Sequence, residues 1–185
     1  VEDSPLRRAA DETADEASGV PAELPARRSL LITDDLELNR DMLSELFADE
    51  YDVFTASSGE ECLDMLQNNP EPISALLLDL VMPDGMDGFD VLTTMQKDAY
   101  LSAIPVVVIT VSSDSESSLK ALALGATDYI VKPFDPAQMR IRVRNAVTKR
   151  EAEEARARNR YALAQQRSEH RRRTEMRYLT AHDAL

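Results

Sequence analysis

The sequence predicts an α/β fold: a doubly wound, five-stranded parallel sheet with helices on both faces and an extended C-terminal helix. Two observations favour this class. Between residues 29 and 147, short apolar runs alternate with segments whose apolar residues recur at helical spacing. Runs such as ALLLDL and IPVVVIT are apolar throughout, which is typical of strands buried on both faces of a parallel sheet. Right-handed crossovers then place helices on each side of the sheet.

The first half of the chain contains two predicted strands, LLIT (residues 30–33) and YDVFTA (residues 51–56). Between them, five apolar residues fall on one helical face, which predicts that this face is buried: Leu38, Met42, Leu43, Leu46 and Phe47. Ser57 with Glu60 forms a capping box that predicts the start of a second helix.

The second half continues the alternation. ALLLDL and IPVVVIT are the third and fourth strands, with the helical segment GFDVLTTMQKD between them. Ser113 with Glu116 is another capping pair, and DYIVKPF (residues 128–134) is the last strand. Asp135 and Pro136 suit the N-cap and first-turn positions of a final helix.

The ends of the chain differ in composition from its centre. Residues 1–28 combine Ala, Pro, Ser and acidic residues with few large apolar ones, which predicts a disordered acidic extension. Residues 29–147 form the predicted folded domain. Residues 148–180 contain neither Gly nor Pro and are rich in good helix formers, which predicts a helical signalling linker without a strong heptad seam.

Composition also excludes several classes of protein. Cys62 is the only cysteine, so neither an intrachain disulfide nor a thiolate metal cluster is expected, and a cytoplasmic setting fits. No apolar run approaches the roughly 20 residues of a membrane span, and the basic tail has no Trp or Phe for membrane binding. The sequence up to residue 147 has 28 Asp+Glu against 11 Lys+Arg, which disfavours nucleic acid and favours divalent cations.

Chemically reactive side chains stand where the predicted strands end. Asp34 and Asp35 follow the first strand, and Asp79, Thr110 and Lys132 stand at the ends of the third, fourth and fifth. Ligand sites of doubly wound sheets lie outside the carboxyl ends of the strands, so these groups are expected to converge. Asp34 or Asp35 alone has a second interpretation as a helix N-cap.

A cluster of three acids needs a compensating cation, and Mg²⁺ suits a few carboxylate oxygens together with exchangeable waters. Lys132 adds a positive charge from the opposite side. A carboxylate between two cations is suited to attack phosphorus, because the cations neutralise the oxygens of the transferred group. Asp79 is therefore predicted to form an aspartyl phosphate.

Four motifs in order resemble the receiver domain of bacterial two-component response regulators: DD at 34–35, DLVMP at 79–83, IT at 109–110 and DYIVKPF at 128–134. The resemblance covers about Ser29 to Val147. It implies a flavodoxin-like fold with strand order 2-1-3-4-5, and a sensor histidine kinase or phosphotransfer protein as the partner.

The resemblance also implies roles for individual residues. Asp79 matches the phosphoacceptor, and Asp34 and Asp35 match the acidic pair that holds Mg²⁺, with Asp35 favoured over Asp34 as the direct ligand. The backbone carbonyl of Val81 completes the metal site. Thr110 matches the switch hydroxyl.

Two further roles follow from the resemblance. Tyr129 matches the aromatic residue that turns inward on phosphorylation, and Lys132 matches the phosphate partner. The Lys132–Pro133 bond is expected to be cis, an isomer that X–Pro bonds reach at modest cost.

One segment departs from the family pattern. In MPDGMDG, three residues (84–86) precede the Asp-Gly pair where the family has two, so the loop beside the site is one residue longer. Asp84 and Asp87 are interpreted as turn residues beside Gly rather than as metal ligands.

The predicted signal passes from the phosphorylated site to a surface formed by the fourth helix, fifth strand and fifth helix, and homodimerisation on activation is expected. The segment AHDAL (residues 181–185) resembles the opening of diguanylate cyclase (GGDEF-type) domains, which predicts the start of a truncated output domain of that type. Two alternatives are a metal-dependent phosphohydrolase, which Val81 at the general-acid position disfavours, and a stand-alone or pseudo-receiver that acts as a docking module.

Overall fold

The computed structural model of the chain describes residues 27–111 and 115–182. The predicted disorder of residues 1–26, the capping role of Ser113 and the final residues of the AHDAL match lie outside these ranges. The elements, in chain order, are β1 (Arg28–Thr33), α1 (Glu37–Phe47), β2 (Tyr51–Ala56), α2 (Gly59–Asn68), β3 (Ile73–Asp79), α3 (Gly88–Gln96), a 3₁₀ turn η1 (Leu101–Ala103), β4 (Val106–Thr110), α4 (Ser115–Ala123), β5 (Asp128–Val131) and α5 (Pro136–His182).

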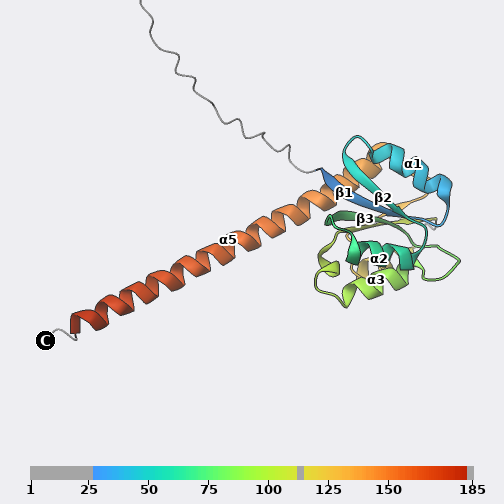
Figure 1. Cartoon of the computed structure of the whole chain (residues 1–185). Helices are drawn as coiled ribbons and strands as arrows, with labels where there is room; N and C mark the ends of the chain where they lie inside the picture. The colour runs from blue at the N-terminus through green and yellow to red at the C-terminus, as the bar shows by residue number, and fades with distance from the viewer. Residues whose placement is uncertain (1–26, 112–114, 183–185) are drawn as a thin grey trace, which may run out of the picture.

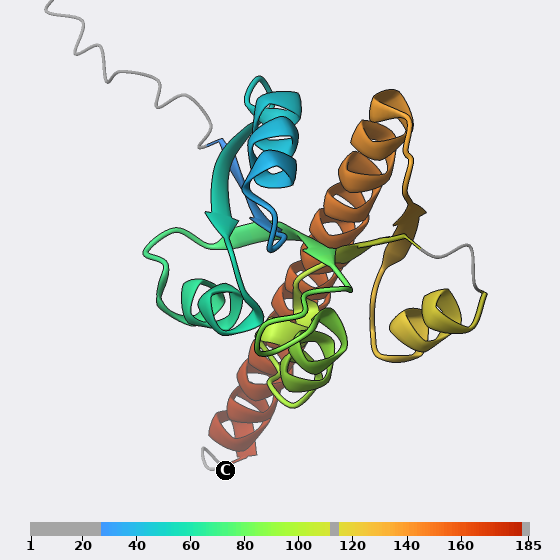
Figure 2. The ribbon, with the colours of Figure 1, turned by 90° about the vertical axis from the view of Figure 1, so that its right-hand side faces the viewer.

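The five strands form one parallel sheet in the order β2-β1-β3-β4-β5, which confirms the predicted fold and strand order. Helices α1 and α5 lie on one face of the sheet, and α2, α3 and α4 lie on the other (Figure 2). The crossovers therefore alternate between the two faces, as in doubly wound folds.

Each central strand is buried on both faces because its successive side chains point to opposite sides. In β3, Ala75 and Leu77 pack with α1 and α5, whereas Leu76 and Leu78 pack with α2, α3 and α4. All four side chains are fully buried. The continuous apolar runs in the sequence therefore correspond to a sheet with one hydrophobic layer on each face.

The predicted buried face of α1 is only partly correct. Leu43 and Phe47 are buried, whereas Leu38 is 80% exposed and Met42 is 47% exposed. At about 100° per residue, Leu38 and Met42 lie roughly 100–140° around the helix from Leu43. This angle turns both side chains away from the sheet, because only a narrow stripe of α1 contacts it.

The predicted helix caps also differ in detail. The cap of α2 is one residue later than predicted: the Ser58 hydroxyl accepts a hydrogen bond from the Glu61 N–H (3.2 Å). The Glu61 carboxylate accepts hydrogen bonds from the N–H and the hydroxyl of Ser57, both at 2.7 Å. Ser57 with Glu60 was therefore the wrong pair, because the helix begins at Gly59.

The boundaries of two strands differ by a few residues from those predicted. Strand β1 begins at Arg28, within the segment predicted to be disordered. Strand β5 ends at Val131, so Lys132 follows the strand directly. The start of α5 is as predicted, since Pro136 is its first residue and the Asp135 carboxylate accepts a hydrogen bond from the N–H of Ala137 (2.7 Å).

Helix α5 is 47 residues long and extends far beyond the sheet (Figure 1). Its first turns are buried through Met139, Val143 and Val147. Every side chain from residue 156 to residue 177 is exposed. Among the described helices, none is long and apolar enough to cross a membrane.

Candidate functional site

Polar side chains at the ends of four strands lie at one edge of the sheet. Asp34 directly follows β1, Asp79 is the last residue of β3, Thr110 is the last residue of β4, and Lys132 directly follows β5. Asp34, Asp79 and Thr110 are at most 3% exposed. Because all the strands are parallel, their carboxyl ends meet at this edge, and the convergence expected from the sequence is observed.

Lys132 joins the two buried acids. Its Nζ lies 2.6 Å from Oδ2 of Asp79 and 3.3 Å from Oδ2 of Asp34. The N–H of Lys132 also donates to the carbonyl oxygen of Thr110 (2.7 Å), which fixes the backbone from which the side chain extends. One ammonium group therefore neutralises part of the charge of two carboxylates.

The Asp79 carboxylate is held at both oxygens. Oδ2 accepts from Lys132, and Oδ1 accepts from the backbone N–H of Val81 (3.0 Å). The Val81 side chain is 55% exposed, so the backbone of this residue lies at the rim of the site rather than in the core.

Asp34 has several protein partners of its own. Its carboxylate accepts from the N–H of Leu36 (2.9 Å) and from Nδ2 of Asn39, which lies 3.0 Å from each oxygen. Arg40 Nη1 donates to the carbonyl oxygens of Asp34 (2.7 Å) and Asp35 (3.0 Å). The N-cap interpretation of Asp34 or Asp35 is wrong, because Leu36 occupies the N-cap position of α1.

The electrostatics of the site follow from burial and crowding. Burial raises the pKa of Asp79 above its ordinary value of 3.8, and the nearby charge of Asp34 raises it further, whereas the hydrogen bond and charge of Lys132 oppose this shift. For Lys132, burial acts to lower the pKa, but the hydrogen bond to Asp79 and the charges of both acids raise it overall. Lys132 is therefore a cation at neutral pH, and the acids favour additional positive charge.

The donor set fits a divalent metal ion. Asp34, Asp35 and Asp79 each offer one carboxylate oxygen, and these oxygens lie within 4.8 Å of one another. Asp35 is only half-buried, and within the described ranges its carboxylate has no hydrogen-bond or ion-pair partner. Carboxylate oxygens that partly face solvent suit Mg²⁺, which keeps several waters.

The two predicted switch residues differ in exposure. Thr110 is buried at the end of β4 (2% exposed), and Tyr129 is 37% exposed on the neighbouring strand β5. The peptide bond between Lys132 and Pro133 is cis, as expected.

The longer loop after β3 is attached to α2. The N–H of Met86 donates to Oε1 of Glu60 (3.0 Å), and Gly85 has a φ of +89°. Asp87 is the N-cap of α3 and forms a reciprocal capping box with Asp90. The acidic cluster found among the described residues contains neither Asp84 nor Asp87. Asp87 is a helix cap rather than the turn residue that the sequence predicted.

Gly88, the first residue of α3, packs directly against the strand end that carries Asp79. A Cβ atom at Gly88 would lie 2.5 Å from the carbonyl oxygen of Asp79 and 2.7 Å from Cα of Leu80. The sequence alone gave no signal for this contact, because the apolar pattern does not report distances between backbones.

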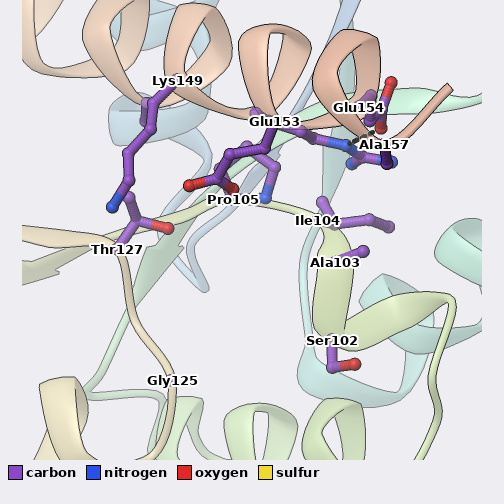
Figure 3. Close-up of a pocket in the computed structure, with 12 residues that line it drawn as sticks. Ser102, Ala103, Ile104, Pro105, Gly125, Thr127, Lys149, Glu153, Glu154 and Ala157 are labelled. Carbon is purple, nitrogen blue, oxygen red and sulfur yellow. Dashed lines mark hydrogen bonds and ion pairs between the residues drawn. The ribbon is translucent and has the colours of Figure 1, made fainter. Parts of the chain in front are cut away.

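A hollow of about 370 Å³ lies at the edge of the sheet opposite the acidic site, between α5 and the segments that precede β4 and β5 (Figure 3). Lys149 and Glu153 line it, together with the ion pair between Arg150 and Glu154 (2.7 Å). Its positive and negative charges balance. It is therefore distinct from the acidic site in both place and charge.

The fold and the acidic site define a class of protein, the single-domain α/β modules with a carboxylate cluster at the carboxyl edge of a five-stranded parallel sheet. The family model of the response regulator receiver domain matches residues 30–144. The chain belongs to the response regulator receiver family.

Two relatives and one solved structure illustrate the similarity. The chain is 36% identical over 118 residues to "Probable transcriptional regulator ycf27" of Porphyridium aerugineum, covering 64% of this chain and 47% of that protein. It is 34% identical over 121 residues to the response regulator SaeR of Staphylococcus aureus, covering 65% of this chain and 50% of SaeR. The chain thus spans about half the length of these relatives.

Among solved structures, a CheY-like response regulator receiver domain protein from Methanospirillum hungatei superposes with a TM-score of 0.63 at 26% identity. The match covers 69% of this chain and 99% of that one. The receiver fold therefore accounts for about two thirds of the chain.

Proposed function

We propose that the chain is a phosphorylation-controlled receiver that accepts a phosphoryl group from a histidine kinase or phosphotransfer protein on Asp79. The observation that supports this most strongly is the Lys132 ammonium 2.6 Å from the Asp79 carboxylate at the carboxyl edge of the sheet. A carboxylate in such a position lies next to a cation that stabilises phosphoryl oxygens.

In the proposed reaction, a carboxylate oxygen of Asp79 forms a bond to phosphorus while the bond from phosphorus to the imidazole nitrogen of the donor histidine breaks. The Lys132 ammonium moves its hydrogen bonds from the carboxylate toward the phosphoryl oxygens. Asp34, Asp35, Asp79 and the backbone carbonyl of Val81 are the groups proposed to hold Mg²⁺, which when bound supplies further neutralisation of phosphoryl charge.

Thr110 and Tyr129 are proposed to report the modification. The Thr110 side chain stands at the end of the strand next to β3, within the same cluster of strand ends. Its movement toward a phosphoryl group would leave space beside β5 for the half-exposed Tyr129 ring. The modification then biases the equilibrium between two arrangements of this edge.

The surface of α4, β5 and α5 is the proposed site of readout and homodimerisation. It exposes three large apolar side chains besides Tyr129: Leu119, Leu122 and Ile141. An ion pair between Arg142 of α5 and Asp128 of β5 (2.7 Å) lies on the same side. Apolar groups surrounded by charged ones are the usual composition of a protein interface.

A phosphorylation assay tests the proposed function. Incubation with acetyl phosphate and Mg²⁺ should add the mass of one phosphoryl group to the intact chain, and omission of Mg²⁺ or the change Asp79→Asn should abolish the addition. Asp79→Asn with undiminished phosphorylation would refute the assignment. A wild-type chain that gains no mass would instead support the docking-module alternative, and rapid repeated turnover of a small phosphoester would support a phosphohydrolase.

For the output domain, we propose a diguanylate cyclase domain that is linked to the receiver through α5. The support is the AHDAL segment at residues 181–185, whose last three residues lie outside the described ranges. The relative ycf27, which is named as a probable transcriptional regulator, offers transcriptional regulation as the competing output. A chain that extends past Leu185 should convert GTP to a cyclic dinucleotide under the first proposal and bind duplex DNA under the second.

A further inference from the structure

We infer that Asn39 is a positioning residue for the carboxylate cluster of Asp34, Asp35 and Asp79, with Arg40 as its companion. The inference rests on the proposed function, because it concerns how these carboxylates are oriented to bind Mg²⁺. Neither residue belongs to the four sequence motifs that identify the family, and neither was singled out by composition or spacing. Both lie in the first turns of α1, immediately after the acidic pair.

The contacts of Asn39 are specific to one carboxylate. Its Nδ2 lies 3.0 Å from both Oδ1 and Oδ2 of Asp34, so the amide group contacts both carboxylate oxygens rather than only one. Asp34 itself is completely buried. Because this side chain is buried, its orientation in the metal-free chain depends mainly on the protein donors around it.

Asn39 also counteracts a competing contact. The Lys132 ammonium lies 3.3 Å from Asp34 and 2.6 Å from Asp79, so it attracts both carboxylates. Loss of the Asn39 amide would leave Asp34 with the N–H of Leu36 and with Lys132 as its charged partner. The Asp34 carboxylate would then rotate toward Lys132 and away from the Asp35 carboxylate, with which it is proposed to hold Mg²⁺.

Arg40 fixes the backbone of the same turn. One guanidinium nitrogen donates to the carbonyl oxygens of both Asp34 and Asp35, at 2.7 and 3.0 Å. Helix α1 has no side-chain cap at its N-cap residue Leu36, so this turn lacks the usual stabilisation of a helix start. Asn39 holds the Asp34 side chain and Arg40 holds the main chain of the acidic pair.

Groups that orient metal ligands from outside typically change metal affinity by about 10–100-fold when removed. Asn39→Leu keeps the number and branching of the side-chain heavy atoms and removes the amide, so we expect the Mg²⁺ dissociation constant to rise about tenfold. The measurement is calorimetric titration of the whole chain with Mg²⁺ in the absence of any phosphodonor. Asn39→Ala serves as a second variant in case Asn39→Leu does not fold.

Asn68→Leu is the matched control. Asn68 also donates to an aspartate, Oδ1 of Asp64 at 2.8 Å, but it is exposed on α2. We expect the Mg²⁺ affinity of this variant to stay within about twofold of wild type. The comparison separates loss of the Asn39 amide from the general effect of replacing a helical asparagine.

A kinetic readout distinguishes positioning from a structural role. In Asn39→Leu, the Mg²⁺ concentration that gives half-maximal phosphorylation by acetyl phosphate should rise by the same factor as the dissociation constant, while saturating Mg²⁺ restores the wild-type maximum rate within about twofold. Unchanged Mg²⁺ affinity in both Asn39 variants would overturn the inference and leave the proposed function intact. A wild-type chain that binds no Mg²⁺ would overturn both.

Discussion

At the residue scale, the negative charges of two buried acids are partly neutralised by one cation. Asp34 and Asp79 are each at most 3% exposed, and Lys132 contacts both. Removal of water from charged groups costs several kcal/mol per ion unless a partner compensates. The ammonium therefore has a structural role as well as its proposed role toward phosphate.

Lys132→Ala is expected to destabilise the Mg²⁺-free chain by about 3 kcal/mol, because it leaves two buried carboxylates without their shared cation. Urea unfolding in EDTA measures the change, and added Mg²⁺ should recover part of it. Lys97→Ala, at an exposed lysine after α3, is the control and should change the free energy of unfolding by less than about 0.5 kcal/mol. A loss at Lys132 no larger than this control would contradict the account.

The pH dependence of stability follows from Asp79. Its pKa in the folded chain is raised above 3.8, so the folded state binds this proton more tightly than the unfolded state does. Ionised Asp79 therefore lowers stability at neutral pH, and this cost disappears as the pH falls through the raised pKa toward 3.8. Without Mg²⁺, Asp79→Asn should be more stable than wild type at neutral pH, with a gap that closes on acidification.

Urea unfolding curves of both proteins across this pH range provide the measurement. Mg²⁺ should reduce or reverse the difference at neutral pH, because the wild type retains a carboxylate ligand that the variant lacks. If Asp79→Asn is the less stable protein at neutral pH in EDTA, the description of Asp79 as a destabilising buried charge is wrong.

Four of the residues that the sequence identified share one property: each stands at or directly after the end of a strand. Asp34, Asp79, Thr110 and Lys132 were found because parallel strands bring their carboxyl ends together, a relation that follows from chain order alone. Asn39 and Arg40 were not found, because their role depends on how the first turn of α1 is oriented relative to β1. The spacing of residues in one sequence does not report how the first turn of α1 is oriented relative to β1.

At the element scale, the close contact between α3 and the end of β3 determines how the strand that carries Asp79 is supported. Gly88 has no room for a Cβ against the backbone of Asp79 and Leu80. The loop between the two elements is also attached to α2 through Met86 and Glu60. Three elements thus share one contact region beside the site.

Gly88→Ala is expected to lower stability by about 1–3 kcal/mol and to slow phosphorylation, because α3 or the end of β3 must move. Gly125→Ala is the control: Gly125 has a φ of +92°, so alanine is strained there, but the residue lies before β5 at the opposite edge. This control should lose stability and keep the wild-type rate of phosphorylation at saturating Mg²⁺. Equal rates in Gly88→Ala and wild type would show that the contact does not support the site.

The helix α1 illustrates why elements were easier to predict than the faces they bury. Its existence followed from regular apolar spacing, yet Leu38 and Met42 are exposed. Five apolar residues in eleven exceed what a narrow contact with the sheet can cover, and the sequence did not indicate which of them would remain outside. The same limit explains the one-residue error at the start of α2, since Ser57 and Ser58 are adjacent and both are good caps.

At the scale of the whole molecule, the body and the projecting helix have different stabilities. An ion pair between Arg28 of β1 and Glu151 of α5, with two hydrogen bonds of 2.7 Å, holds α5 where it leaves the sheet. From residue 156 to residue 177 all side chains are exposed. Most helical stability in proteins comes from tertiary packing of one face, so we expect this segment, whose side chains are all exposed, to be less stable than the body.

Hydrogen exchange should reveal the difference. In the unphosphorylated chain, amides of residues 158–177 should exchange far faster than those of β3, because local opening of the projecting helix exposes no core. Addition of beryllofluoride and Mg²⁺, which mimic the acyl phosphate, should slow exchange in this segment if activation pairs two helices. Protection equal to that of β3 before activation would contradict the description of the segment as unsupported.

The overall architecture was predictable because it depends on patterns that repeat along the chain. The alternation of strands and helices gave the sheet, and the resemblance carried by four motifs gave the strand order. The partner of α5 was not predictable, because its exposed surface has no continuous apolar seam to define one.

The most direct test of the central claim is to locate the phosphoryl group. After reaction with acetyl phosphate and Mg²⁺, borohydride reduces an aspartyl phosphate to homoserine, and the tryptic peptide spanning residues 41–97, which contains no internal Lys or Arg, is then fragmented by mass spectrometry. The account predicts homoserine at position 79 and nowhere else in that peptide. Homoserine at another aspartate, with residue 79 unmodified, would contradict it.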